Sequence, residues 1–191
     1  MIPTMADDNL LNTYVDRIIA VWRSATADQE AEGRAWYRVA NGVADMISGG
    51  NVRAGAGVLA ALSPQKSWPA NIKLAEDAIT SGTARGHVKD ALAKAERIML
   101  GEDPLLVLPV DSKTYNFYRC IVDPEDAESV CIDRHAHDIV AGERYGDRDR
   151  GLSSKRRYAT VALAYRLAAN RLDELPSVVQ AVTWVVWRED V

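Results

Sequence analysis

An acidic residue and a histidine lie where a short apolar run gives way to a helical pattern. The apolar run covers residues 130–132, Asp133 follows it directly, and His135 comes two residues later. Aspartate is a favoured N-cap residue, and the positive end of the helix dipole keeps a carboxylate at that position ionised. An ionised carboxylate with a fixed direction is a candidate for acid–base or electrostatic catalysis. Capping alone is the simpler role of Asp133, and both alternatives stay open on these residues.

A metal site around the same residues is the first alternative chemistry. Asp133 and His137 are four positions apart and share one face of the expected helix, whereas His135 points elsewhere. The only other histidine is His87, and no cluster of histidine and cysteine occurs. We therefore expect no metal ligands here. The sequence also contains no nucleophile elbow and no phosphate-binding glycine loop.

Helical periodicity dominates the chain and indicates an all-α protein with about nine helices. Short apolar runs occur at 105–107 and 130–132, but they form no series of strands. A charge-dense segment at 143–157 is typical of a solvated loop, with a phosphate-contacting arginine surface as the alternative. The expected helices cover about residues 10–22, 29–47, 52–62, 69–82, 87–100, 113–121, 133–142, 153–169 and 176–189.

Composition sets the size and general class of the protein. The 191 residues are 48% hydrophobic, enough for one domain (residues 1–191) of ordinary size, built as one body or two lobes. A net charge of -4 argues against bulk electrostatic coating of nucleic acid. Cys120 and Cys131 lie in apolar contexts and are too few for a disulfide scaffold. With no apolar run of about 18 residues, we expect a soluble cytoplasmic protein without a membrane partner.

Three blocks of residues occur in an order that resembles a known superfamily. Leu-Ala-Ala-Leu-Ser-Pro-Gln lies at 59–65 and is followed by Trp68 and Asn71; Leu-Pro-Val-Asp-Ser-Lys-Thr lies at 108–114; Ile-Asp-Arg-His lies at 132–135. These blocks look like those of the helix–hairpin–helix DNA glycosylases of the endonuclease III type. The resemblance covers about residues 52–141 in scattered blocks, and it implies the fold of that superfamily.

The resemblance also implies roles for individual residues. Asp133 occupies the position of the catalytic carboxylate, and Lys113 precedes it by 20 residues, the spacing of the superfamily's lysine. A carboxylate near C1′ would stabilise the positive charge that grows on the sugar as the N-glycosidic bond breaks, or activate a water. The amine of Lys113 could attack C1′ and form a Schiff base, or it could bind phosphate; a solvated surface lysine is its ordinary alternative. Gln65 would fill the gap left by the extruded base.

Further residues are implied in substrate or DNA binding. Aromatic side chains could stack on an extruded base, His135 could orient Asp133, and Arg134 could contact phosphate. Against these roles stand ordinary ones, because serine and glutamine also cap helices and tyrosines at helical spacing are commonly core residues. The full binding set implied by the resemblance comprises Gln65, Ser63, Trp68, Asn71, Tyr115, Arg134 and His135.

Two departures from the superfamily pattern matter for DNA binding. Val110, Asp111 and Ser112 replace the hairpin segment whose glycines let backbone amides reach phosphate, and the anionic Asp111 would repel phosphate. The iron–sulfur cysteines of some members are absent, so we expect no cofactor. The expected partner is DNA or a nucleotide.

Two later blocks look like those of helical proteins that bacteriophages and actinobacteria use in base hypermodification. They lie at 162–169 and 176–188. This second resemblance implies only fold and broad context. The sequence therefore leaves two main functions open, beside a third, a metal-dependent hydrolase around His135 and His137, which would need His87 or further carboxylates nearby. One is a glycosylase-like enzyme acting on a modified base or a nucleotide, and the other is a non-catalytic DNA- or protein-binding module on a degenerate glycosylase scaffold.

Overall fold

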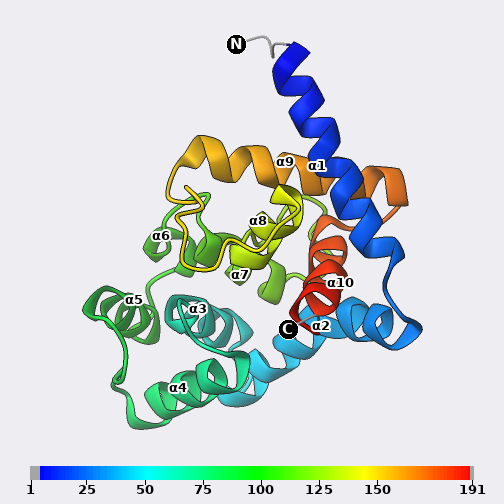
Figure 1. The fold of residues 1–191 in the computed structure, drawn as a ribbon. Helices are drawn as coiled ribbons and strands as arrows, with labels where there is room; N and C mark the ends of the chain where they lie inside the picture. Colours follow the sequence, from blue (N-terminus) through cyan, green and yellow to red (C-terminus); the bar gives the residue numbers. More distant parts are fainter. Residues whose placement is uncertain (1–4, 190–191) are drawn as a thin grey trace. The chain divides into compact units, whose positions relative to one another are not determined.

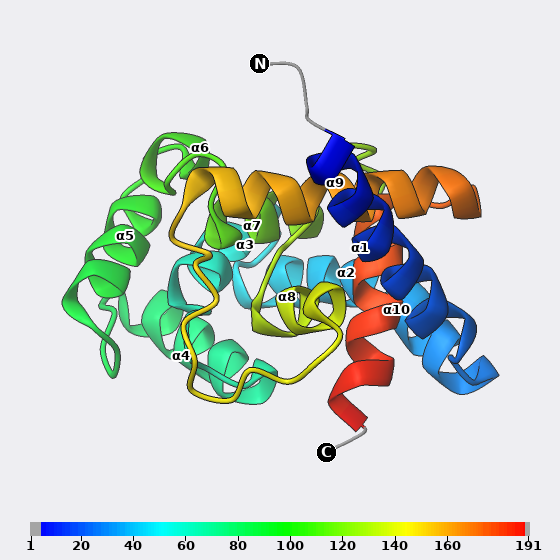
Figure 2. The same ribbon diagram turned by 45° about the horizontal axis from the view of Figure 1, so that its top comes forward.

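The computed structural model describes the backbone of residues 5–189 and the side chains of residues 8–188. Within this range the chain is all-helical, as the periodicity predicts, and contains no strand. None of these helices is both long and apolar enough to cross a bilayer. The ten helices (Figures 1 and 2) are α1 Met5–Arg23, α2 Ala27–Ile47, α3 Val52–Leu62, α4 Trp68–Ser81, α5 Lys89–Met99, α6 Pro104–Val107, α7 Lys113–Val122, α8 Arg134–Ala141, α9 Lys155–Leu172 and α10 Pro176–Glu189.

The helix that periodicity misses is α6, which adds a tenth to the nine expected. It has four residues, so it completes little more than one turn and shows no repeating apolar face. Its start is nevertheless signalled locally. Pro104 occupies the first turn, and the side chain of Asp103 accepts a 3.0 Å hydrogen bond from the Leu105 amide. The other apolar run, 130–132, is neither helix nor strand.

The chain divides into two compact units. The first, which we call the terminal unit, combines Met1–Trp36 with Glu125–Val191, and the second, the central unit, is Tyr37–Pro124. Helix α2 contributes residues to both. Each unit is described separately below.

The terminal unit packs α1, α8, α9 and α10 around one apolar core. Ile18 of α1, Ile139 of α8 and Tyr165 of α9 are almost completely buried in it. The first part of α2 lies close against α10, because a Cβ built on Gly33 would stand 2.4 Å from the Cα of Val182. Glycine at position 33 therefore sets the separation of these two helices.

The central unit is built around α3, which packs against α4, α5, α6 and α7. Every residue of α3 from Gly55 to Leu62 is buried. Most of them are small, which lets neighbouring helices approach closely. A Cβ on Gly55 would lie 2.2 Å from the carbonyl oxygen of Ala44 in α2, and one on Gly57 would lie 2.8 Å from Pro104.

Candidate functional site

Asp133 is the N-cap of α8, as its residue type predicts. Its backbone is extended, and Oδ1 accepts a 2.9 Å hydrogen bond from the Ala136 amide. The preceding segment is anchored by Tyr158, whose hydroxyl accepts from the Ile132 amide (3.1 Å) and donates to the Val130 carbonyl (3.2 Å). The carboxylate is partly exposed, and in the part of the chain that the structure describes Oδ2 accepts no hydrogen bond. Oδ1 of Asp133 is thus fixed by the cap, while Oδ2 can still accept a hydrogen bond from a ligand.

His135 lies on the first turn of α8 beside Arg134. The Nε of Arg134 donates a 3.3 Å hydrogen bond to Nε2 of His135, so the ring proton belongs on Nδ1. Burial lowers the pKa of His135; Asp133 opposes this shift and Arg134 adds to it. The imidazole is therefore neutral at neutral pH. The structure shows no hydrogen bond between the described side chains of His135 and Asp133, so an orienting role for His135 is not seen.

An aromatic cluster, which we define as His135, Trp184, Trp36 and Arg188, lies in the terminal unit next to this segment. The rings of His135 and Trp184 meet edge to face with centroids 6.3 Å apart, and those of Trp184 and Trp36 are 4.7 Å apart. The guanidinium of Arg188 lies over Trp184 at 4.4 Å and also pairs with Glu32. Sequence reasoning missed the cluster, because Trp36 and Trp184 fall on two expected helices, 29–47 and 176–189, and nothing in the sequence connects the two residues.

A buried polar network occupies the other end of α8. His137 and Asp138 are 0% and 4% exposed, and their Nδ1 and Oδ1 atoms are 3.1 Å apart. Arg150 donates to both oxygens of Asp138 at 2.7 and 2.8 Å, and the Tyr145 amide donates to Oδ2 at 3.1 Å. Arg157 completes the network at 3.0 Å from Nε2 of His137. Arg150 and Arg157, which the sequence offers as phosphate contacts, are thus engaged inside the protein.

The charges of this network are internally balanced. Burial raises the pKa of the Asp138 carboxyl, but hydrogen bonds from Arg150, His137 and the Tyr145 amide outweigh that effect and leave the pKa below its usual value. Burial and the neighbouring Arg157 lower the pKa of His137, although Asp138 opposes them. Both groups have their partners, so the network is structural. Among residues 8–188, no group of three or more histidine, cysteine, aspartate or glutamate side chains is arranged to hold a metal ion.

Three of the predicted binding residues of the central unit lie in the turn between α3 and α4 or in the first turn of α4. Ser63 is buried and donates to the Ala60 carbonyl at 3.0 Å, which is the capping role. Asn71 is 2% exposed and donates to the Leu59 carbonyl at 3.1 Å, while its Oδ1 is buried without a partner. Gln65 is exposed at the tip, with a left-handed φ of 58°. Gln65 is therefore the member of this group placed to reach a ligand.

The remaining predicted residues of the central unit lie at the starts of α4 and α7. Trp68 is the first residue of α4, and its half-buried ring meets Phe117 of α7 edge to face with centroids 6.2 Å apart. Lys113 is the first residue of α7, and Tyr115 follows in the same turn; both are half-buried. Trp68 thus contributes to packing between α4 and α7.

The segment that lacks the hairpin glycines still forms a tight connection between two helices. Residues 108–112 join α6 to α7, and Asp111 adopts a left-handed φ of 60°. Ser112 caps α7 by accepting a 3.2 Å hydrogen bond from the Tyr115 amide. Aspartate tolerates the left-handed region better than most non-glycine residues. Asp111 can therefore adopt the backbone conformation for which a turn commonly uses glycine.

The predicted residues therefore form two groups. Asp133, Arg134 and His135 follow one another in the terminal unit. The central unit contains the α3–α4 turn with Gln65 at its tip and the α6–α7 turn with Lys113 at its end.

These features define an all-α protein with a carboxylate fixed at a helix N-terminus. The chain belongs to a protein family of unknown function, DUF7178, whose profile matches residues 1–191. No curated protein and no solved structure matches the chain.

Proposed function

We propose that this protein acts on the N-glycosidic bond of a nucleobase, in DNA or in a nucleotide, with Asp133 as the catalytic carboxylate on a glycosylase-like scaffold. The observation that carries the proposal is the state of Asp133. Its Oδ1 is held by the Ala136 amide, while its partly exposed Oδ2 has no partner within residues 8–188. Capping uses one carboxylate oxygen, and the second is free to act on a substrate.

The proposed chemistry follows from the charge that develops as the bond breaks. Departure of the base leaves positive charge on the sugar, and the fixed anion of Asp133 stabilises it or takes a proton from an attacking water. The neutral imidazole of His135 adds no competing positive charge beside the carboxylate. Lys113 is the proposed amine for the lyase variant of the reaction, in which it attacks C1′.

Two further features support a nucleic-acid substrate. The aromatic cluster presents indole and imidazole rings beside the Asp133 segment, and aromatic faces stack on bases of any sequence. Gln65, exposed at the α3–α4 tip, is the proposed residue that enters the base stack.

An abasic-site assay on a panel of normal and modified bases, in duplexes and single strands, tests the proposal. Asp133→Asn removes the charge and keeps an N-cap side chain. Asp103→Asn is the matched control, because Asp103 also caps a helix, α6, and carries no proposed catalytic role. We expect base release by the wild type and by Asp103→Asn, and its loss in Asp133→Asn. Absence of release from every substrate would favour a non-catalytic binding module on the same scaffold.

A further inference from the structure

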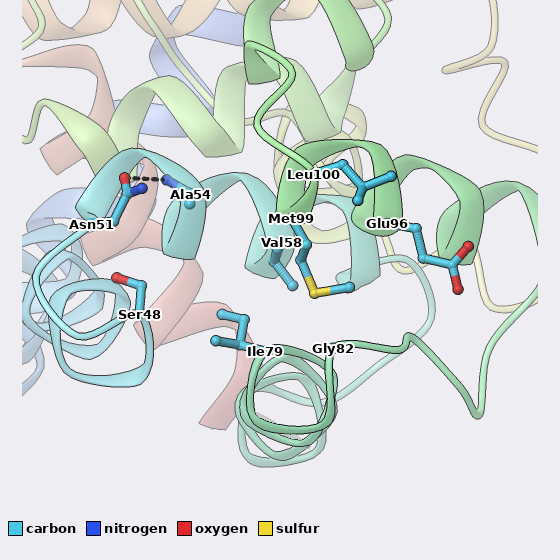
Figure 3. A pocket seen from close by; sticks show the side chains of 9 residues that line it. All are labelled: Ser48, Asn51, Ala54, Val58, Ile79, Gly82, Glu96, Met99 and Leu100. Carbon is cyan, nitrogen blue, oxygen red and sulfur yellow. Dashed lines mark hydrogen bonds between the residues drawn. The ribbon is translucent and has the colours of Figure 1, made fainter.

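The central unit contains a cavity of about 420 Å³ that is independent of Asp133. Its apolar wall is made by Val58 of α3, Ile79 of α4, and Met99 and Leu100 at the end of α5. Figure 3 shows Met99 and Val58 across from Ile79. The volume lies within the range of small-molecule sites, roughly 300–1,000 Å³. Leu100 is 86% exposed, so part of the apolar surface is left uncovered.

The polar groups of the cavity are arranged to favour a cation. Three helices end at its rim: Ser48 follows α2, Gly82 caps α4 and Leu100 caps α5. Each helix C-terminus carries roughly half an elementary negative charge. One helix, α3, begins there and contributes the opposite sign. Its Ala54 amide donates to Asn51 Oδ1 at 3.2 Å, and the ends of α2 and α5 are partly satisfied as well, by backbone hydrogen bonds from Gly50 and Leu100. With three helix C-termini against one N-terminus, the electrostatic potential inside the cavity is negative.

Glu96 adds a full negative charge to the same cavity. Its half-buried side chain lines the cavity at the end opposite Ser48 and Asn51 (Figure 3). The neighbouring Arg97 is paired with Glu102, and no side chain in the part of the chain that the structure describes forms an ion pair with Glu96. Glu96 therefore lacks a counter-charge in a cavity at which three helices end, and a ligand can supply one.

We propose that this cavity binds a primary aliphatic amine. The hydrocarbon body of the ligand lies on Val58, Ile79 and Met99, and its ammonium group meets Glu96 and the carbonyl oxygens at the helix ends. An alcohol of equal length would gain only the apolar contact, and a carboxylate would be repelled by Glu96. Selectivity for amine over acid is thus the property that distinguishes this site from a merely apolar groove.

Methyl NMR of the full chain tests the proposal, with hexylamine, hexanol and hexanoate as probes. Hexylamine is expected to shift the methyl signals of Val58, Ile79 and Met99 saturably, with weaker shifts from hexanol and none from hexanoate. Glu96→Gln should weaken hexylamine binding about three- to fivefold, the scale of a partly exposed ion pair, and added salt should act in the same direction. Glu76→Gln is the matched control, since Glu76 is exposed on α4 and does not line the cavity.

Any of three results would overturn the proposal. Hexylamine could cause no saturable shift, hexylamine and hexanoate could bind equally well, or Glu96→Gln could leave hexylamine binding unchanged. Stronger binding of hexanol than of hexylamine would identify the cavity as a docking groove for an apolar partner group instead. Asp133→Asn should bind hexylamine like the wild type, so the outcome is separate from that of the proposed catalytic function.

Discussion

The Ala136 amide and Oδ1 of Asp133 are joined by a 2.9 Å hydrogen bond, which both caps α8 and fixes the direction of the carboxylate. The side chain of Asp133 therefore contributes both to the stability of α8 and to the proposed chemistry. A substitution can separate the two contributions, because asparagine can accept the same hydrogen bond without carrying the charge.

Substitutions at Asp133 are expected to separate these two contributions. Asp133→Ala loses the cap and should lower the free energy of unfolding by about 0.5–2 kcal/mol, whereas Asp133→Asn should stay close to the wild type. Urea unfolding monitored by circular dichroism measures the difference. If alanine and asparagine at this position gave equal stability, the Ala136 hydrogen bond would contribute nothing to the fold.

The two histidines of α8 are expected to make stability depend on pH. Burial lowers the pKa of both His135 and His137 in the folded state below the value of about 6.5 for an unfolded chain. The unfolded state thus binds more protons. The contribution of the two histidines to stability is therefore fully present above about pH 6.5, and it falls as the pH drops toward their pKa values in the folded state. The pKa of Asp138 is also lowered in the folded state, so its contribution to the folding stability is lost only below about pH 4.

Melting temperatures between pH 7.5 and pH 5.5 check this expectation. His137→Gln should show a shallower fall than the wild type, with the contribution of His135 remaining. A melting temperature that rises on acidification over this range would contradict the assignment of neutral imidazoles at positions 135 and 137.

Replacing either of two glycines is expected to destabilise the fold for steric reasons. A Cβ at Gly55 would meet the Ala44 carbonyl oxygen at 2.2 Å, and one at Gly33 would meet the Cα of Val182 at 2.4 Å. Both obstacles are backbone atoms, so alanine should cost about 1–3 kcal/mol or more. Gly42 is the control, because nothing lies within 4 Å of its Cβ position, and alanine there should stabilise α2 by up to about 1 kcal/mol. Equal stability of all three variants in urea would contradict the packing described.

The α6–α7 turn is expected to limit DNA affinity through Asp111. Asp111→Gly removes both a left-handed non-glycine residue and a negative charge, so duplex binding should strengthen about two- to fivefold at low salt and less at high salt. Asp173→Gly is the matched control, since Asp173 is also left-handed, with φ 56°, but caps α9 in the terminal unit. Fluorescence anisotropy with a labelled duplex measures the effect. A similar gain in both variants would remove the turn from the proposed interface.

The helices were largely predictable because their signals are local. Asp133 and Gly142 bound α8 where residue type predicts, with a side-chain cap at one end and a left-handed residue at the other. Helix α6 was missed because four residues carry no period, although Asp103 and Pro104 signal its start.

The surroundings of the candidate site were less predictable because they depend on contacts between distant residues. Trp36 and Trp184 meet only through the packing of α2 against α10. Arg150 belongs to a segment whose charge density is typical of solvated loops, yet it reaches back to the buried Asp138. Such pairings have no signature in residue type or spacing along the chain.

The role of Asp133 at a glycosidic bond is decided by comparing base release by Asp133→Asn with base release by Asp103→Asn. Both variants keep a capping side chain, so both should fold like the wild type. We expect Asp103→Asn to release base at the wild-type rate and Asp133→Asn to be slower by about 100-fold or more, the scale of a lost electrostatic contribution at a reacting centre. Equal release by the two variants would contradict this role of Asp133.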